Sequence, residues 1–392
     1  MRKERLSNAC EFYSGTGFPN KYQGISDGKY PFYKVGDISR NIASGNYMLG
    51  KSENFIDDNI LLEIKGKIVP PGTIVFAKIG EALRLNKRAI TTQKCIIDNN
   101  VMGIKPIKEY LDLKYFYYYM QNLDMQRYSE ATTVPSVKKS TLESIKMLIP
   151  DYKEQEKIAY KLDVITNLIV NRENALRTLE SLVKSRFVEL FGDPVTNPMK
   201  WKVKSLSELG NCKNGMNFHK GESGIDIHCL GVGDFQNLSV ITDTSVLPIV
   251  SLNENPSEEY MLQDGDIVFV RSNGNKNLVG RCLTIYPHDI PTTFSGFCIR
   301  YRISKTDKVL TEYLLQVLKH ESMRQKMTGR GANIQNLNQQ ILSALQIPLP
   351  PIDLQRQFIE FVELTDKSKL AVQQSIETLQ MLKAKLMQDY FG

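Results

Sequence analysis

The residues best suited to metal-dependent hydrolysis gather in one short segment. Asp57, Asp58 and Glu63 stand close to Lys65, and carboxylates beside a lysine are groups with which a nuclease holds Mg²⁺. The corresponding segment of the second half of the chain contains no such set, although much else recurs there. We therefore expect no catalysis at this segment.

Other enzyme signatures are weak or absent. The segment 12–17 loosely resembles the glycine-rich cofactor loop of a methyltransferase, but its counterpart keeps only Gly215, and a turn explains it better. No Walker-type GxxxxGK[ST] segment occurs, and the four histidines lack metal-ligand spacing. We expect no catalytic residue, no metal site and no cofactor bound by this chain itself, which indicates a binding or scaffold role.

The clearest pattern is an internal repeat. Phe191-Gly192 returns as Phe391-Gly392, an offset of 391 − 191 = 200 residues. No gap is needed from there back to Gln155, which returns as Gln355. The chain is therefore two copies of one unit, and a doubled unit can bind two targets at once.

A long helix with an apolar stripe is predicted at the end of each copy. From Ile158 to Leu190, apolar residues recur in steps of mostly four and three, the 3.5-residue period of a coiled-coil seam. The second stripe, from Phe358 to Tyr390, is more polar and includes lysines at 369 and 383. Such a stripe needs a partner, and the other helix of the same chain is the nearest. The alternative is that each helix packs only on its own globular part.

A globular part of short strands precedes each helix. Apolar runs that follow glycine predict strands at 72–78 and 265–271. Further strands are expected at 88–92, 101–105, 281–286 and 297–303, and helices at 113–128 and 311–327. The predicted fold is α+β, with two similar globular α/β domains at 1–150 and 194–347 and two long spacer helices at 151–193 and 348–392. If the domains lie at opposite ends of the helices, these form an antiparallel coiled coil with internal pseudo-twofold symmetry.

The composition is that of a globular protein with an excess of positive charge. The net charge is +7 at pH 7 and the pI is near 8.9, which favours a polyanionic partner without proving one. No stretch of about 18 apolar residues occurs, and no apolar run follows the basic segment 1–5, so neither a membrane span nor a secretion signal is expected. Six cysteines without a CxxC pair are expected to be reduced thiols in a cytoplasmic protein.

The two globular parts match only when gaps are allowed. Gly72 matches Gly265 at 265 − 72 = 193, whereas Tyr115 matches Tyr313 at 313 − 115 = 198. The long helices keep a single offset throughout. Two similar scaffolds therefore carry different loops, as expected if the two domains bind different targets.

With these features, the chain resembles the DNA-specificity subunit of a type I restriction–modification system over nearly its whole length. The resemblance rests on the doubled plan and on loose motifs that recur in the same order. These are Gly15 with Gly215, 35–38 with 232–235, 72–76 with 265–269, and the proline-led helix starts at 149–155 and 350–355. The chain departs from the family pattern at Asp151-Tyr152 and at Leu354.

The resemblance implies a division of labour between subunits. Each globular part would be a target-recognition domain for one half of a bipartite target in double-stranded DNA. Two methyltransferase subunits carrying S-adenosylmethionine would dock on this chain, with a restriction subunit that uses ATP and Mg²⁺. This chain would itself cut and methylate nothing. The alternatives are a non-catalytic protein–protein scaffold with two similar binding domains, and a stand-alone nuclease or methyltransferase.

Candidate DNA contacts follow the two matched strands, and a second candidate set lies at 132–133 and 329–333. Lysine and arginine neutralise phosphates, whereas hydrogen-bonding groups at base edges read the sequence. For any one residue, a solvated charged loop is an equally good explanation. A helix of about 36 residues is about 54 Å long, or about 16 base pairs, an upper guide to the half-site separation. The proposed DNA-binding residues are Lys78, Arg84, Lys87, Arg88, Arg271, Asn273, Asn275, Lys276, Arg281 and Arg330.

Overall fold

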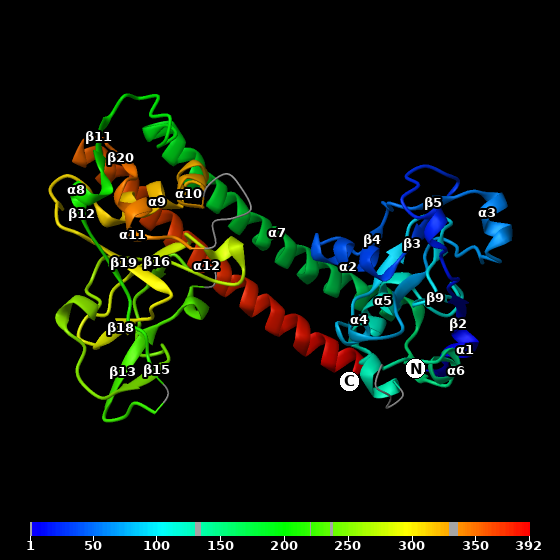
Figure 1. Cartoon of the computed structure of the whole chain (residues 1–392). Coiled ribbons are helices and arrows are strands. Elements are labelled where there is room, and N and C mark those ends of the chain that lie inside the picture. The colour runs from blue at the N-terminus through cyan, green and yellow to red at the C-terminus, as the bar shows by residue number, and fades with distance from the viewer. Residues whose placement is uncertain (1, 130–134, 220, 236–237, 329–335) are drawn as a thin grey trace. The chain divides into compact units, whose positions relative to one another are not determined.

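The computed structural model of the chain describes residues 2–129, 135–219, 221–235, 238–328 and 336–392 (Figure 1). The chain forms two compact units. The first unit is Met1–Ala175 with Val372–Gly392, and the second is Leu176–Ala371. Each unit has a hydrophobic core of its own, and each of the two long helices is divided between the units. The units thus group the chain differently from the four-part division into domains and helices, which stays a prediction.

The first unit is built on a five-stranded sheet whose central strand is apolar on both faces. All four residues of β6 are buried, as expected for a strand covered on both sides. The five-stranded sheet has the order β2 (Cys10–Ser14), β9 (Val101–Pro106), β6 (Ile74–Ala77), β7 (Ala89–Thr91), β4 (Met48–Leu49). The smaller sheets are β5 (Phe55–Ile56), β3 (Tyr30–Tyr33), β8 (Ile96–Ile97), and β1 (Arg2–Arg5) with β10 (Lys146–Ile149).

The second unit repeats this sheet plan strand for strand. Its five-stranded sheet has the order β12 (Gly210–Asn214), β19 (Cys298–Ile303), β16 (Asp266–Val270), β17 (Cys282–Ile285), β14 (Val240–Ile241). The smaller sheets are β15 (Ile249–Leu252), β13 (Ile225–Leu230), β18 (Thr292–Phe294), and β11 (Lys202–Ser205) with β20 (Gln346–Leu349). In both units the last strand of the large sheet, β4 or β14, pairs in parallel with its neighbour.

Short helices connect the strands, and a 40-residue helix follows each domain. In the first unit the short helices are α1 (Leu6–Ala9), η1 (Asn20–Tyr22), α2 (Val35–Ala43), α3 (Asp58–Glu63), α4 (Glu81–Arg84), α5 (Leu113–Asn122), η2 (Met125–Tyr128) and α6 (Lys139–Glu143). In the second they are α8 (Leu206–Leu209), η3 (Val232–Asp234), η4 (Glu258–Tyr260), η5 (Lys276–Leu278), α9 (Thr311–Lys319), α10 (Glu321–Thr328) and α11 (Gln339–Ser343). The long helices are α7 (Tyr152–Phe191) and α12 (Ile352–Phe391).

The helices predicted at 113–128 and 311–327 are each interrupted. In the first unit, the Asp124 carboxylate accepts the Gln126 N–H at 2.9 Å, which caps a new turn and separates α5 from η2. In the second unit, His320 has an extended backbone with ψ of 140° and separates α9 from α10. In the aromatic run 115–119 of α5, residues 115–118 are buried and Tyr119 is half-buried, so this run packs into the core of the first unit.

Two of the repeated sequence motifs recur because the backbone geometry requires them. A Cβ atom on Gly15 would lie 1.8 Å from the Asp98 carbonyl oxygen, and one on Gly215 would lie 2.1 Å from that of Ser295. Only glycine allows so close an approach. The aspartates of the two Val-Gly-Asp motifs are helix caps, because each accepts the backbone N–H three residues earlier at 2.7 and 2.8 Å.

A buried glutamine fastens the first turn of each long helix to its domain. The Gln155 side chain accepts the Asp112 N–H at 2.8 Å and donates to the carbonyls of Tyr110 and Pro150 at 2.9 and 3.1 Å. In the second unit, Gln355 makes the same three bonds, accepting from Leu310 at 2.9 Å and donating to Lys308 and Pro350 at 3.0 and 2.9 Å. This joint explains why Gln155 returns as Gln355.

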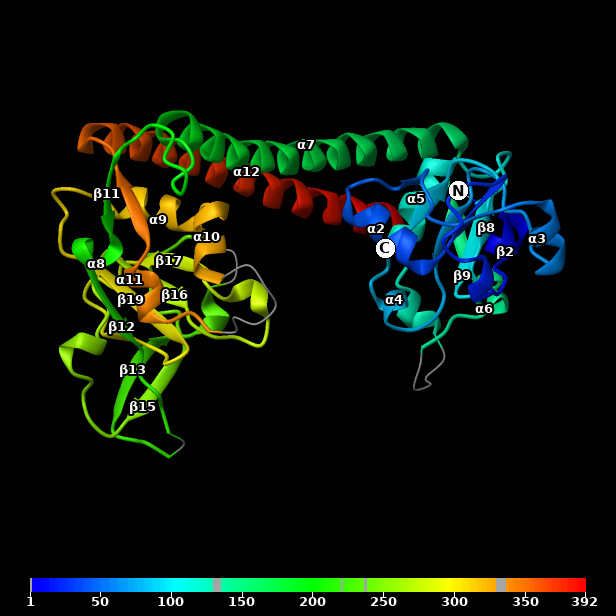
Figure 2. The ribbon, with the colours of Figure 1, turned by 45° about the horizontal axis from the view of Figure 1, so that its top comes forward.

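The last aromatic residue of each long helix packs into the unit where that helix ends. In the second unit, the Phe191 ring lies 4.9 Å from the Tyr313 ring, centroid to centroid. In the first unit, the Phe391 ring lies 5.3 Å from the ring of Tyr115, and the end of α12 is seen beside α5 (Figure 2). Lys161, near the start of α7, also reaches the Tyr390 hydroxyl at 3.3 Å. The start of one helix therefore meets the end of the other, and the predicted antiparallel pairing is confirmed.

Candidate nucleic-acid interface

The loop that follows the central strand is held in the same way in both units. After β6, the Lys78 N–H donates to the Asn100 carbonyl and the Lys78 carbonyl accepts the Val137 N–H, both at 2.9 Å. After β16, the Arg271 N–H donates to the Phe297 carbonyl and the Arg271 carbonyl accepts the Leu337 N–H, both at 2.8 Å. Lys78 and Arg271 are therefore equivalent positions.

The loop after the central strand pairs with the described residues that precede α6 or α11. Isolated β-bridges join Ile79 to Ser136 in the first unit and Ser272 to Asn336 in the second. In the sequence, the second member of each bridge stands three residues after the other candidate segment (136 − 133 = 3 and 336 − 333 = 3). The segments 132–133 and 329–333 themselves, with Arg330, lie outside the described residues. Each unit thus presents one composite surface, made by the loop after the central strand and by residues 135–138 before α6 or 336–338 before α11.

Three of the first-unit candidates lie where solvent reaches them. Lys78 and Lys87 are half-buried, and Arg84 is exposed on α4. The Arg84 guanidinium lies 3.3 Å from the Glu81 carboxylate, an exposed pair that contributes little to stability. These three side chains remain candidates for phosphate contacts.

Arg88 is a correction to the predicted set. Its side chain is 2% exposed, and its guanidinium lies 4.8 Å from the centroid of the Phe76 ring and donates to the Lys87 carbonyl at 3.1 Å. Burial lowers the pKa of Arg88 to about 10, although Tyr117 and Asp124 act in the opposite direction. A guanidinium in this position cannot reach DNA, so we remove Arg88 from the proposed contacts. The sequence could not show this because charge and chain position do not indicate which way a side chain points.

Several of the second-unit candidates use their side chains to hold the loop after β16 in shape. The Arg271 guanidinium donates to the Gly296 carbonyl at 3.2 Å. The side-chain oxygens of Asn273 and Asn275 accept the backbone N–H two residues later at 2.7 and 3.1 Å, the Asx-turn geometry that shapes a tight loop. Arg281 is half-buried at the end of the loop. Lys276 belongs to η5, but its side chain is outside the described atoms.

Phe297 is a surface residue that the sequence analysis missed. The sequence predicts a strand at 297–303, but β19 begins at Cys298, and the Phe297 side chain is 61% exposed. It lines a hollow of about 440 Å³ with Val232, Ser272, Asn273, Gly274 and Asn336. The equivalent first-unit position, by the hydrogen bonds above, is Asn100. An exposed aromatic residue in a turn, where the other copy has asparagine, is the signal that could have identified it.

The acidic cluster first considered for hydrolysis is engaged in structural contacts. The Asp57 carboxylate accepts the Lys29 N–H at 2.9 Å, Asp58 pairs with the Lys29 ammonium at 2.6 Å, and Glu63 pairs with Lys21 at 2.6 Å. Among the described residues, no three His, Cys, Asp or Glu side chains are placed to hold a metal ion. None of the six cysteines forms a disulfide. Across the described helices, none is long and apolar enough to cross a membrane.

Comparison with known proteins identifies the class of this doubled fold. A family model described as the type I restriction modification DNA specificity domain matches the chain twice, at residues 3–180 and 198–380. Each match covers one globular part and most of the helix that follows it. The chain belongs to the type I restriction–modification DNA specificity family and carries two specificity domains.

Individual relatives agree with this assignment. The type I restriction enzyme MjaVIII specificity subunit of Methanocaldococcus jannaschii is 23% identical over 92% of this chain and 85% of its own length. The EcoKI specificity subunit of Escherichia coli K12 is 24% identical over 60% of this chain, and the match spans 53% of that relative. The crystal structure of the S subunit from M. genitalium has the same fold, with a TM-score of 0.56, 15% identity, and coverage of 100% of this chain and 96% of that one. A second structure, from a study of the assembly of a type I restriction–modification system, gives a TM-score of 0.62 at 15% identity, covering 100% of this chain and 97% of that one.

Proposed function

We propose that each of the two domains reads one half of a split DNA target through its composite surface. The observation that carries the proposal is the equivalence of the two surfaces. Lys78 and Arg271 are held by the same pair of backbone hydrogen bonds, yet the loops that follow differ in sequence and length. A constant frame with different reading loops is what a protein needs to recognise two different half-sites.

The second part of the proposal concerns partners. Two methyltransferase subunits and a restriction subunit would dock on this chain, and S-adenosylmethionine, ATP and Mg²⁺ would be bound by those subunits. The chain itself would catalyse nothing and would act in the cytoplasm, where DNA and these partners meet. The names of the relatives, all specificity subunits of type I restriction enzymes, support this assignment.

Methylome sequencing tests the reading of a split target. Cells that carry this chain with its methyltransferase subunits should show one motif with two specified parts separated by unspecified bases. The substitution Asn273→Ala, in the second domain, should weaken the base preference in one part of the motif only. Lys78→Gln, in the first domain, should affect only the other part. Lys305→Gln, at an exposed position of the second unit, is the control and should leave the motif unchanged. A continuous motif, or no motif, contradicts the proposal.

Binding to DNA in solution separates this function from that of a protein scaffold. A protein that neutralises several phosphates loses affinity steeply between about 50 and 200 mM salt, because counterions are released on binding. We expect that steep loss for the assembled complex on a duplex that carries the mapped motif. A flat response over the same range would favour a scaffold that binds proteins.

A further inference from the structure

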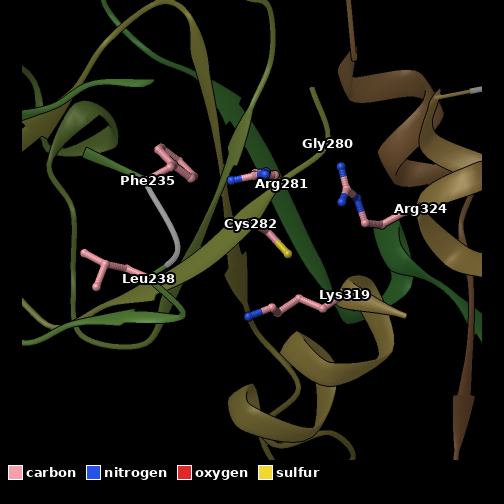
Figure 3. A pocket seen from close by; sticks show the side chains of 7 residues that line it. All are labelled: Phe235, Leu238, Gly280, Arg281, Cys282, Lys319 and Arg324. Carbon is pink, nitrogen blue, oxygen red and sulfur yellow. The ribbon is translucent and has the colours of Figure 1, made fainter. Parts of the chain in front are cut away.

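A basic pocket adjoins the loop 271–281 of the second unit, the loop proposed to read DNA and called its reading loop below. Its lining residues are Phe235, Leu238, Gly280, Arg281, Cys282, Lys319 and Arg324 (Figure 3). Arg281 lies just before β17, Lys319 ends α9, and Arg324 belongs to α10. Three cationic side chains from three parts of the chain therefore line one cavity, and none of the described residues that line it is a carboxylate.

The pocket is physically continuous with the loop proposed to read DNA. The Arg324 guanidinium donates to the carbonyls of Asn277 and Val279 at 3.2 and 3.4 Å. Both carbonyls belong to the loop that runs from Arg271 to Arg281, and Arg281 itself lines the cavity. A group bound in the pocket would therefore lie beside the loop 271–281. Arg324 of α10 holds that loop through these two hydrogen bonds.

The surroundings of Lys319 make its positive charge costly unless an anion lies beside it. The Lys319 ammonium donates to the Ser239 hydroxyl, a neutral partner that leaves its charge in place. Burial lowers the pKa of Lys319 and the positive charges of Lys369 and Lys184 lower it further, with only Cys282 and Asp366 acting the other way. Burial also raises the pKa of the Cys282 thiol to about 12, so that this thiol is uncharged at neutral pH. An anion placed beside Lys319 would favour its charged form.

The first unit has different residues at the positions equivalent to those of the pocket. Strand pairing aligns Ala89, opposite Val75, with Leu283, opposite Val268, so the residue before each, Arg88 or Cys282, is equivalent. Where the second unit has a short thiol in the pocket wall, the first unit thus has a buried guanidinium of its own. At the offset of 198, positions 319 − 198 = 121 and 324 − 198 = 126 are both glutamine in the first unit. The three converging cations are therefore a feature of the second unit.

The size of the pocket limits what it can hold. Its volume is about 200 Å³, below the roughly 300–1,000 Å³ of sites for cofactors and drug-sized ligands. A single phosphate group with part of its sugar fits that space, whereas a nucleotide cofactor does not. We propose that this pocket holds one backbone phosphate of the DNA beside the half-site read by the second domain, with Arg281, Lys319 and Arg324 as donors. This inference rests on the proposed function of the chain.

The test uses the assembled complex and a duplex that carries the motif mapped by methylome sequencing. Lys319→Gln and Arg324→Gln introduce the residues that the first unit carries at these positions, so the fold should tolerate both. Each lost phosphate contact should reduce the slope of log affinity against log salt by about 0.9. Lys305→Gln removes the same charge from the exposed surface outside the pocket and should leave the slope nearly unchanged.

Neutral methylphosphonate linkages, introduced one at a time, locate the phosphate. One linkage beside the second half-site should weaken binding by the unsubstituted protein, and the same linkage should cause little further loss in Arg324→Gln. If the unsubstituted complex binds the duplex but both pocket variants match Lys305→Gln at every linkage, the pocket proposal is wrong and the proposed function stands. If inorganic phosphate raises the Tm of the free chain while the DNA measurements do not change, the pocket is a free-anion site and the proposal is also overturned. Failure of the unsubstituted complex to bind the split duplex would instead count against the proposed function.

Discussion

Replacement of Gln355 by methionine should loosen the joint between α12 and the second domain. Gln355 is 0% exposed and makes three hydrogen bonds to backbone groups, at 2.9, 3.0 and 2.9 Å. Methionine has a similar length but can make none of these bonds. At about 1 kcal/mol of net stabilisation for each bond, the variant should lose about 3 kcal/mol. The loss should exceed that of Gln374→Met, an exposed position of the same helix where changes are usually within about 0.5 kcal/mol.

Amide hydrogen exchange measures this loss at the joint itself. A loss of about 3 kcal/mol corresponds to about a 100-fold faster exchange, because each 1.36 kcal/mol is a factor of ten. The Leu310 N–H, which donates to Gln355, should exchange faster in Gln355→Met, whereas the Asp112 N–H should not. Gln155→Met should show the opposite pattern, since Gln155 accepts the Asp112 N–H. Equal protection of Leu310 in Gln355→Met and Gln374→Met would refute the idea that the glutamine holds the joint.

Three further predictions concern single side chains. Phe297→Ala should change the free energy of unfolding by less than about 0.5 kcal/mol, because the ring is 61% exposed, yet it should weaken binding to the mapped duplex; unchanged affinity would exclude a role in recognition. Arg88→Met should leave the salt dependence of DNA binding unchanged because the guanidinium is buried, whereas Arg84→Gln should reduce it, and titration with duplex at several salt concentrations compares them. Burial lowers the pKa of Lys383, so the charged form is destabilised in the folded state and stability should rise as pH increases from the folded pKa towards that of a free lysine. The stability gained by Lys383→Met over the unsubstituted chain should therefore be largest at neutral pH and shrink towards a pH of about 10.5. Urea unfolding of both proteins across this pH range measures the difference. A difference that does not change with pH would contradict the idea that the buried charge destabilises the fold.

The fold could be predicted because its repeated residues meet steric and hydrogen-bonding requirements of the backbone. Gly15 and Gly215 recur where a Cβ would collide with a carbonyl oxygen, and Gln155 and Gln355 recur because each satisfies three backbone groups. The 3.5-residue stripe likewise reflects the burial of one helix face, and Ile158, Leu162 and Ile165 are all buried. Patterns of this kind survive in the sequence because few other residues meet the same requirement.

The candidate site was less predictable because side-chain direction is set by tertiary contacts. Arg88 and Lys87 are neighbours in the segment before β7, yet one is buried and the other half-buried, because the Arg88 guanidinium packs over the Phe76 ring. Phe297 lies one residue outside its expected strand, and that shift exposes its ring. The break between α5 and η2 depends on one carboxylate, Asp124, that accepts a backbone N–H. Each of these outcomes depends on single contacts that leave no periodic trace in the sequence.

What the two copies share and where they differ suggests how such a protein can change its target. The gapless repeat has its glutamine joint at one end and its terminal phenylalanine at the other, and these residues attach each long helix to a domain at both of its ends. The glutamine belongs to the unit where the helix begins, and Phe191 or Phe391 packs in the unit where it ends. The loops after β6 and β16 contribute to none of these attachments. If these loops read the DNA as proposed, a change in one loop would leave the joints intact, and the half-site read by one domain could change without disturbing the long helices.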